Sequence, residues 1–331
     1  MNTRTLNNTF ILIVGLSFNL NAQTNVLYVK PTGVKGDGSS WEKATNDLQE
    51  ALKKARKGTQ IWVAAGLYLP TDGSDRHISF EIPDGVALFG GFAGNEKSIS
   101  QRSFLQHPTI LSGNIGSEDP DDNSYNVVYS KNASSTTLLD GFIISGGNAN
   151  GEGAFSTRQR SGGGLYNESS PQAVSNPTIA NCTFIDNFAK DGGAVYNNGK
   201  GGEASPTITD CYFEKNTSYL DGGAVYNDGR AGGISNPTFT NCTFSKNEGN
   251  YGGAVFNYGM NGHAEPRFAN CVFSENESFV KGGAVFHLSG EKLDKAMFGN
   301  SVFNNNQALD QASNDVHHYL VATRQNASAF R

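Results

Sequence analysis

The chain has 331 residues and a formal net charge of −6 at pH 7; 17% of its residues are charged and 40 are glycines. Gly, Asn and Ser favour turns over helices, so this composition argues against an ordinary helical protein. The acidic balance gives no reason to expect a nucleic-acid partner, because proteins that bind DNA or RNA usually present a basic surface.

The first predicted element is a secretory signal over residues 1–22. Arg4 supplies a weakly basic start, and the apolar run over residues 10–16 is too short to span a bilayer. Ala22, followed by Gln23, offers a small residue for cleavage. The pattern predicts an exported protein, secreted or associated with the outer membrane at the cell surface, with no transmembrane segment in the mature chain. A buried N-terminal strand is the alternative interpretation of this run.

An amphipathic helix within residues 23–70 is predicted next, as an N-terminal cap. Apolar residues recur there at helical spacing until Gly58 ends the helix, and residues 61–64 are predicted to form the first strand. A helix here would cover the open end of a stacked sheet, whose unpaired edge otherwise invites aggregation. The apolar residues of the predicted helix are Trp41, Ala44, Leu48, Ala51, Leu52 and Ala55.

A five-residue motif then recurs every 30 residues, from Gly-Gly-Leu-Tyr-Asn at 163–167 to Gly-Ala-Val-Phe-His at 283–287. A second motif runs in phase with it and places Asn three residues after Phe, as in Phe184 and Asn187. Both elements are short, alternate in apolar character and are bounded by Gly, Asn or Pro, which is typical of strands and turns. One such strand cannot bury its apolar face alone, so the copies are predicted to stack about 4.8 Å apart.

These Gly-Gly-Ala and Phe-x-x-Asn repeats, over residues 160–318, resemble the repeats of polymorphic outer membrane proteins and of the wider pectin-lyase-like group of exported bacterial proteins. The resemblance extends upstream to residues 90–96, 111–114 and 139–142. It implies an all-β fold, a single-stranded right-handed parallel β-helix that occupies residues 23–331. The motifs are specific for the fold and weak for function.

Four cysteines occupy the same place in successive repeats, and Ser301 takes that place in the fifth copy. Stacked positions fill an interior column, in which Cys packs as a small apolar residue. Free thiols are therefore favoured over two disulfides. The four residues are Cys182, Cys211, Cys242 and Cys271.

An aromatic column forms a further repeat, and its position allows two interpretations. Alternation places each aromatic on the face opposite the apolar column of Val195, so one of the two columns lies outside or at a corner. A buried packing ladder is the default, because aromatic side chains mostly contribute buried area. An exposed column would instead offer a flat surface to sugar rings. The residues are Tyr166, Tyr196, Tyr226, Phe256 and Phe286.

Four basic residues are the candidate substrate-binding residues. Lys200 and Arg230 each lie three residues after an equivalent asparagine, so they are predicted in neighbouring rungs of one stacked loop, while Arg158 and Arg160 lie in the loop before the first clear rung. The resemblance implies a role for them. Polysaccharide lyases of the pectin-lyase-like group use a Lys or Arg to take a proton beside a uronate carboxylate, and Ca²⁺ or another cation neutralises that carboxylate. Solvated loop charge is the alternative.

The acidic loop that contains Glu118, Asp119, Asp121 and Asp122 is the candidate metal site. Several carboxylates within a few residues can supply oxygen ligands, so calcium is the one cofactor that the sequence suggests. The spacing lacks the EF-hand pattern, and an exposed acidic loop is the alternative. The histidines do not cluster in the sequence as a zinc site requires.

Two functions fit this sequence. The first is a secreted or surface-attached module that binds extracellular polysaccharide or a surface protein, within a system that degrades polysaccharide. The second is a polysaccharide lyase acting on an acidic, uronate-containing glycan. The regular rungs favour the first, because an active site normally interrupts a repeat. Interruptions at residues 116–124 and 148–161 are where an active site is expected.

Overall fold

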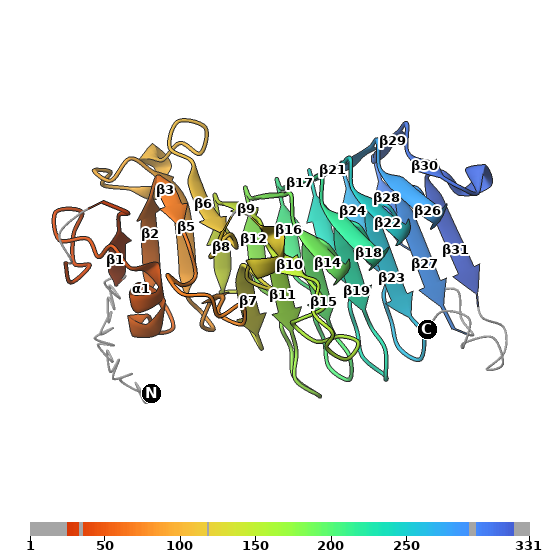
Figure 1. Cartoon of the computed structure of the whole chain (residues 1–331), viewed down its shortest axis with the longest axis horizontal. Coiled ribbons are helices and arrows are strands. Elements are labelled where there is room, and N and C mark those ends of the chain that lie inside the picture. The colour runs from red at the N-terminus through yellow and green to blue at the C-terminus, as the bar shows by residue number, and fades with distance from the viewer. Residues whose placement is uncertain (1–24, 33–35, 118, 291–295, 321–331) are drawn as a thin grey trace, which may run out of the picture.

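The computed structural model describes residues 25–32, 36–117, 119–290 and 296–320. The chain coils into a right-handed parallel β-helix of about 10 turns, as predicted (Figure 1). The predicted signal over residues 1–22 lies outside the described residues. Within the described ranges, no helix is both long and apolar enough to cross a membrane.

Four parallel sheets, here numbered I to IV in the order in which a rung visits them, surround the core. Sheet I contains β1 (Val26–Val29), β2 (Gln60–Ala64), β5 (Ala87–Phe92), β8 (Leu138–Asp140), β12 (Thr178–Ala180), β16 (Thr207–Thr209), β20 (Thr238–Thr240), β24 (Arg267–Ala269) and β28 (Met297–Gly299). Sheet II contains β3 (Gly66–Tyr68), β6 (Thr109–Ser112), β9 (Ile143–Ser145), β13 (Thr183–Ile185), β17 (Tyr212–Glu214), β21 (Thr243–Ser245), β25 (Val272–Ser274) and β29 (Val302–Asn304).

Sheets III and IV complete each rung. Sheet III contains β10 (Asn148–Ala149), β14 (Phe188–Asp191), β18 (Thr217–Asp221), β22 (Glu248–Tyr251), β26 (Glu277–Lys281) and β30 (Gln307–Ala308). Sheet IV contains β4 (Phe80–Glu81), β7 (Val128–Lys131), β11 (Leu165–Glu168), β15 (Val195–Asn198), β19 (Val225–Asp228), β23 (Val255–Gly259), β27 (Val285–Ser289) and β31 (Val316–Leu320). The helices are α1 (Leu48–Lys54) and the single 3₁₀ turns η1 (Ile99–Gln101), η2 (Pro120–Asp122) and η3 (Gln311–Ser313).

The core is built from columns of identical positions. In sheet IV, Val195 pairs in register with Val225, and all atoms of both side chains are buried. The phenylalanines of the Phe-x-x-Asn motif stack inside the coil, with neighbouring ring centroids 4.7 to 5.1 Å apart. The four cysteines are buried free thiols in the adjacent turn, as the repeat predicted. The phenylalanines are Phe184, Phe213, Phe244, Phe273 and Phe303.

The asparagine of each Phe-x-x-Asn motif continues a buried hydrogen-bonded ladder. Each side-chain amide donates to the carboxamide oxygen of the next rung at 2.8 to 3.0 Å. The amide of Asn216 also donates to the backbone oxygen of Phe184 at 2.9 Å, and its oxygen accepts the backbone N–H of Asn187. Because these buried amides find partners, the ladder avoids the free energy penalty of unsatisfied polar groups. Its members are Asn187, Asn216, Asn247, Asn276 and Asn306.

The N-terminal cap differs from its prediction in two respects. Helix α1 begins after Asp47, whose carboxylate accepts the backbone N–H of Glu50 at 3.0 Å, so Trp41 and Ala44 precede the helix. The prediction that residues 61–64 form the first strand is wrong, because β1 precedes β2 and pairs with it in parallel. Helical spacing alone could not locate the N-terminus of a helix that a side-chain cap defines.

Replacing Val225 with Asp should destabilise the fold far more than replacing Lys215 with Asp. The first change buries an uncompensated carboxylate and costs several kcal/mol, whereas an exposed substitution usually changes stability by about half a kcal/mol or less. Lys215 is exposed and has φ 52°, a left-handed conformation that Asp tolerates well. Thermal unfolding of the two variants provides the measurement, and equal melting temperatures would contradict the assignment of Val225 to the core.

Candidate functional site

Residues 151–161, here called the strap, cover part of the outer face of sheet IV. Tyr166, Tyr196 and Tyr226 stack on that face with ring centroids 5.5 and 4.8 Å apart, in a cluster separate from the main core. Phe155 of the strap packs edge-on against Tyr226, with centroids 6.1 Å apart. The aromatic column therefore points away from the interior of the coil and is nevertheless buried, because other parts of the chain cover it.

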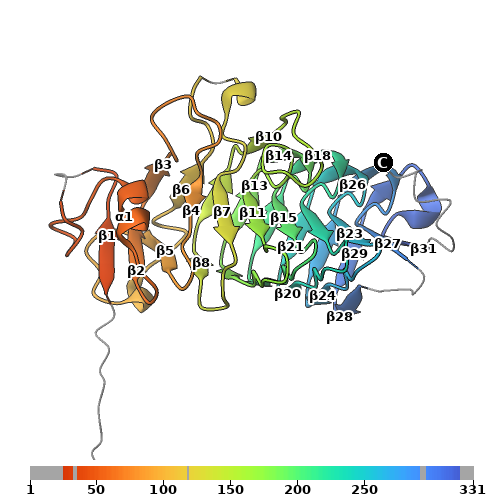
Figure 2. The same ribbon diagram turned by 90° about the horizontal axis from the view of Figure 1, so that it is seen from below.

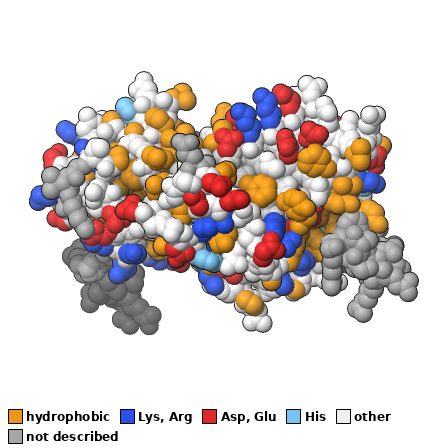
Figure 3. Space-filling view, in the orientation of Figure 1, with side chains coloured by type: hydrophobic (Ala, Val, Ile, Leu, Met, Phe, Trp, Pro, Cys, Tyr) orange, Lys and Arg blue, Asp and Glu red, His pale blue; other side chains and the backbone are white. Residues whose placement is uncertain are grey.

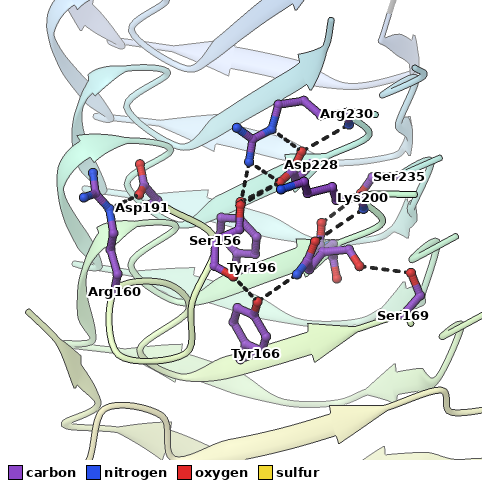
Figure 4. A network of polar contacts seen from close by, with 12 residues as sticks. Ser156, Arg160, Tyr166, Ser169, Asp191, Tyr196, Lys200, Asp228, Arg230 and Ser235 are labelled. Carbon is purple, nitrogen blue, oxygen red and sulfur yellow. Dashed lines mark hydrogen bonds and ion pairs between the residues drawn. The ribbon is translucent and has the colours of Figure 1, made fainter. Parts of the chain in front are cut away.

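A network of polar contacts fastens the strap to sheet IV (Figure 4). The Tyr196 hydroxyl donates to Asp228 Oδ2 at 2.8 Å, and Arg230 Nε donates to Asp228 Oδ1 at 2.7 Å. The Tyr166 hydroxyl donates to the backbone oxygen of Ser156 at 2.6 Å. The side chain of Asp228 is fully buried, so its charge depends on Arg230 for compensation.

A second ion pair joins the strap to sheet III. Arg160 Nε lies 3.0 Å from Asp191 Oδ2, and Asp191 Oδ1 is buried with no hydrogen-bond partner among the described residues. Burial raises the pKa of Asp191 to about 6, against the lowering effect of Arg160. Asp221 pairs with Asp191 in the next rung, and limited access to solvent together with the Asp191 charge raises the pKa of Asp221 well above its ordinary value.

Of the four predicted basic residues, Arg158 and Arg160 belong to the strap, whereas Lys200 and Arg230 lie in two loops that follow sheet IV strands. Arg158 donates to Ser79 Oγ at 2.7 Å and its guanidinium lies 3.9 Å from the ring centroid of Tyr129. Lys200 is exposed, and the next residue donates its backbone N–H to the backbone oxygen of Arg230, so the two loops are neighbours. The structure therefore places Arg158, Arg160 and Arg230 in contact with protein groups and leaves the charge of Lys200 facing solvent.

The ion pair of Arg230 with Asp228 limits the ability of Arg230 to act as a general base. Its guanidinium lies between the rings of Phe155 and Tyr258, 4.0 and 4.8 Å from their centroids. Although burial lowers the pKa of Arg230, the hydrogen bonds and charge of Asp228 raise it above its ordinary value. A general base works best with a pKa near the operating pH. The network is therefore better suited to holding the strap closed than to removing a proton.

The acidic loop is organised by local hydrogen bonds. Asp119 accepts the backbone N–H of Asp121 at 3.0 Å and caps η2, Asp121 accepts the side-chain amide of Asn150 at 2.8 Å, and Asp122 accepts the backbone N–H of Ser117 at 2.7 Å. Glu118 lies outside the described residues.

The guanidinium of Arg76 already supplies positive charge beside this loop. It donates to the backbone oxygens of Asn123 and Asn148 at 2.6 and 2.8 Å, and to Asn150 Oδ1 at 2.7 Å. In the part of the chain that the structure describes, no three His, Cys, Asp or Glu side chains are grouped to hold a metal ion. Calcium binding by the acidic loop stays a prediction.

Sequence reasoning missed a row of exposed side chains on the outer face of sheet III. Tyr219 and Phe279 occupy the same position in β18 and β26, two rungs apart, and are 68% and 51% exposed. Asn250 lies between them and donates its side-chain amide to the backbone oxygen of Tyr219 at 3.2 Å. Leu309 continues the row and is 81% exposed. Together with Phe188 of β14, these residues are here called the sheet III face.

The signal for this face is weak in the sequence because the aromatic residues alternate with a polar residue and do not repeat every rung. In Figure 3, hydrophobic side chains are interspersed with acidic and basic ones over the C-terminal half of the visible surface. A groove of about 550 Å³ lies at the N-terminal end of sheet III, next to η2. Its lining includes Asp121, Asn150, Asp186, Phe188, Lys215 and Thr217.

A repeat described as the Chlamydia polymorphic membrane protein repeat matches residues 181–198 and 210–228. These two rungs are similar to repeats of that type. Both matched segments run from the turn before sheet II to the end of the sheet IV strand, and so contain the asparagine ladder and the buried tyrosine positions. Among curated proteins, none matches this chain.

Similar solved structures include a rhamnogalacturonan lyase, with 14% identity, coverage of 87% of this chain and 74% of that chain, and a TM-score of 0.49. The pectate lyase Pel9A has 12% identity, coverage of 89% and 74%, and a TM-score of 0.45. A pectin methylesterase from Aspergillus niger has 14% identity, coverage of 93% and 94%, and a TM-score of 0.41. Likenesses this remote carry no argument about activity.

Replacing Asp191 with Asn should remove a loss of stability that the parent protein undergoes as pH rises from about 4 to 6. The carboxyl has a pKa of about 6 in the folded protein and an ordinary value of 3.8, so between these values the folded state holds a proton that the unfolded chain has lost. The free energy of unfolding should therefore fall as pH rises from about 4 to 6, by at most about 3 kcal/mol from this group.

Denaturant unfolding at several pH values measures the difference between the parent and the Asp191→Asn variant. Arg160, Arg230, Asp221 and Asp228 act electrostatically on Asp191 or on each other and are unchanged in the comparison. Asp186→Asn, at an exposed position, is the control. An identical pH slope in parent and Asp191→Asn would show that folding does not raise the pKa of Asp191.

Proposed function

We propose that this protein is an exported β-helix that binds extracellular polysaccharide along the sheet III face and does not cleave it. The observation that carries the proposal is the exposure of Tyr219 and Phe279 at equivalent positions of the rungs. The carbon–hydrogen face of a sugar ring is apolar and flat, and it stacks on an aromatic ring, while polar groups nearby bind the hydroxyls.

The spacing of the two rings suits an extended glycan. Neighbouring strands lie about 4.8 Å apart, so positions two rungs apart are separated by about 10 Å, roughly the length of two sugar residues in an extended chain. A glycan that runs along the axis of the coil would therefore place every second sugar over a ring. Exposed apolar residues in a continuous row mark an interaction surface more often than single exposed residues do.

Two separate observations support the proposal that the protein is exported to the cell surface. The predicted signal over residues 1–22 favours export, and the matched repeat is that of a membrane protein. Both are consistent with a molecule at the cell surface, where the long sheet III face meets extracellular glycans or surface proteins.

Replacing Tyr219 or Phe279 with Ala should weaken glycan binding about tenfold or more, equal to at least about 1.4 kcal/mol, because each change removes a stacking ring. The matched control is Tyr212→Ala in β17, since Tyr212 is 57% exposed but belongs to sheet II. Affinity electrophoresis and calorimetry with neutral, uronate-containing and sulfated polysaccharides measure the effect. Equal losses in the control and the two sheet III variants would remove the support for this face.

A lyase acting on an acidic glycan is the second candidate function. The observation in its favour is that the strap, at one of the two interruptions of the repeat, carries Arg160 to the buried Asp191 and packs against Arg230, which pairs with the buried Asp228. A lyase product absorbs ultraviolet light through its unsaturated uronate. We expect no absorbance increase with pectin, alginate or sulfated algal glycans, because ion pairs with buried carboxylates occupy Arg160 and Arg230 and, of the four predicted basic residues, leave only Lys200 facing solvent. An increase that disappears in Arg230→Ala would favour the lyase instead.

A further inference from the structure

The sheet III face is open along the rungs and closed at its N-terminal end. β10 is the first strand of sheet III, and the loop that contains η2 rises beside it (Figure 2). The groove of about 550 Å³ lies where this loop meets the sheet. A linear ligand that follows the face toward the N-terminus of the protein would therefore meet a wall.

The groove leads directly onto the exposed aromatic residues. Phe188 of β14 and Thr217 of β18 both line it and pair in register, so they belong to adjacent rungs. Tyr219 follows Thr217 by two residues in the same strand, so both side chains project from the same side of the sheet. The half-buried ring of Phe188 thus gives the groove an apolar floor that lies two strand positions to the side of the row of Tyr219 and Phe279.

The wall is held in place before any ligand arrives. The side-chain amide of Asn148 in β10 donates to the backbone oxygen of Pro120 at 2.7 Å, and that of Asn150 donates to Asp121 Oδ1 at 2.8 Å. Arg76 holds both asparagines, because its guanidinium donates to the backbone oxygen of Asn148 and to the side-chain oxygen of Asn150. A preformed wall avoids the entropy loss of ordering a loop when ligand binds.

The unpaired charges along this path are mostly acidic and disfavour an anionic ligand, since Lys190 of β14 is paired with Glu152 at 2.7 Å. Two carboxylates, Asp121 and Asp186, and one ammonium, Lys215, line the groove. Further along the sheet, Glu248 and Glu277 pair in register at exposed positions. Carboxylates accept hydrogen bonds from hydroxyl groups but repel uronate or sulfate, so the surface is complementary to a neutral glycan.

We propose that the groove holds the terminal sugar of a neutral polysaccharide chain, whose following sugars lie over Tyr219 and Phe279. The protein then recognises the end of a chain rather than any internal stretch. This inference rests on the proposed function, because it takes the sheet III face as the binding surface. It adds the charge class of the glycan and the part of the chain that is bound.

The test uses the whole protein with size-fractionated xylan, galactan and mannan. For each fraction, the number of protein molecules bound per glycan chain is measured. End recognition predicts that this number stays constant as the chain lengthens. Binding along internal stretches predicts that it rises in proportion to length, and that result would overturn the inference. Uronate polymers should bind more weakly than neutral ones at low salt, and the difference should shrink as salt screens the repulsion.

Variants separate the groove from the open face. Phe188→Ala should weaken binding of both short oligosaccharides and long chains at least tenfold, whereas Phe279→Ala should affect only chains long enough to reach it. Thr217→Trp, which fills the groove without removing a core group, serves where Phe188→Ala unfolds. Asp210→Asn, at an exposed turn between β16 and β17, is the control.

The outcomes distinguish failure of the proposed function from failure of the end-recognition proposal alone. If no glycan binds the parent protein, or if Tyr219→Ala and Phe279→Ala bind long chains as the parent does, the proposed function fails. If these variants lose affinity while Thr217→Trp binds normally, the face binds glycan along its length and the end-recognition proposal alone is overturned. Stronger binding of uronate than of neutral polymers at low salt would overturn the assignment of charge class.

Discussion

Every feature of this molecule depends on the stacking of equivalent residues in parallel, in-register strands about 4.8 Å apart. A side chain at a given position has its own counterpart above and below, so each column must be compatible with itself. Phenylalanine meets this condition by ring stacking, and asparagine meets it because one carboxamide donates to the next. Carboxylates do not: burial raises the pKa of both Asp191 and Asp221, and the charge of Asp191 raises that of Asp221 further.

Because each column repeats one kind of residue, the coil itself could be predicted from the sequence. A constant step between Gly-Gly-Ala motifs requires sheet IV to stay in register, and the structure pairs Val195 with Val225 and Val225 with Val255. In sheet I the register links Thr178 to Thr207 and Thr207 to Thr238, so the intervening turns absorb small changes in length. The repeat therefore predicts the coil and its thiol column, although not the division of each rung into four strands.

The candidate sites were harder to predict because they arise from contacts between distant parts of the chain. Nothing near Asp228 in the sequence indicates that its carboxylate meets the strap residue Ser156. The four basic residues were recognised as neighbours, but their partners were not, and the partners decide whether a charge is available to a ligand. Tyr219 and Phe279 were missed for a related reason, since a search for positions that repeat in every rung overlooks a residue that occurs in alternate rungs.

The same constraint indicates where function can reside in such a fold. Interior columns must repeat the same kind of residue, so variation there destabilises the coil. Outward positions and the loops between sheets can vary without this cost. The two outward aromatic rows illustrate the consequence. The row of Tyr166, Tyr196 and Tyr226 is covered by the strap and adds a second core, while the row of Tyr219 and Phe279 stays open beside a fixed wall. Burial already accounts for the first row, so the proposed glycan binding rests on the second row, which stays exposed.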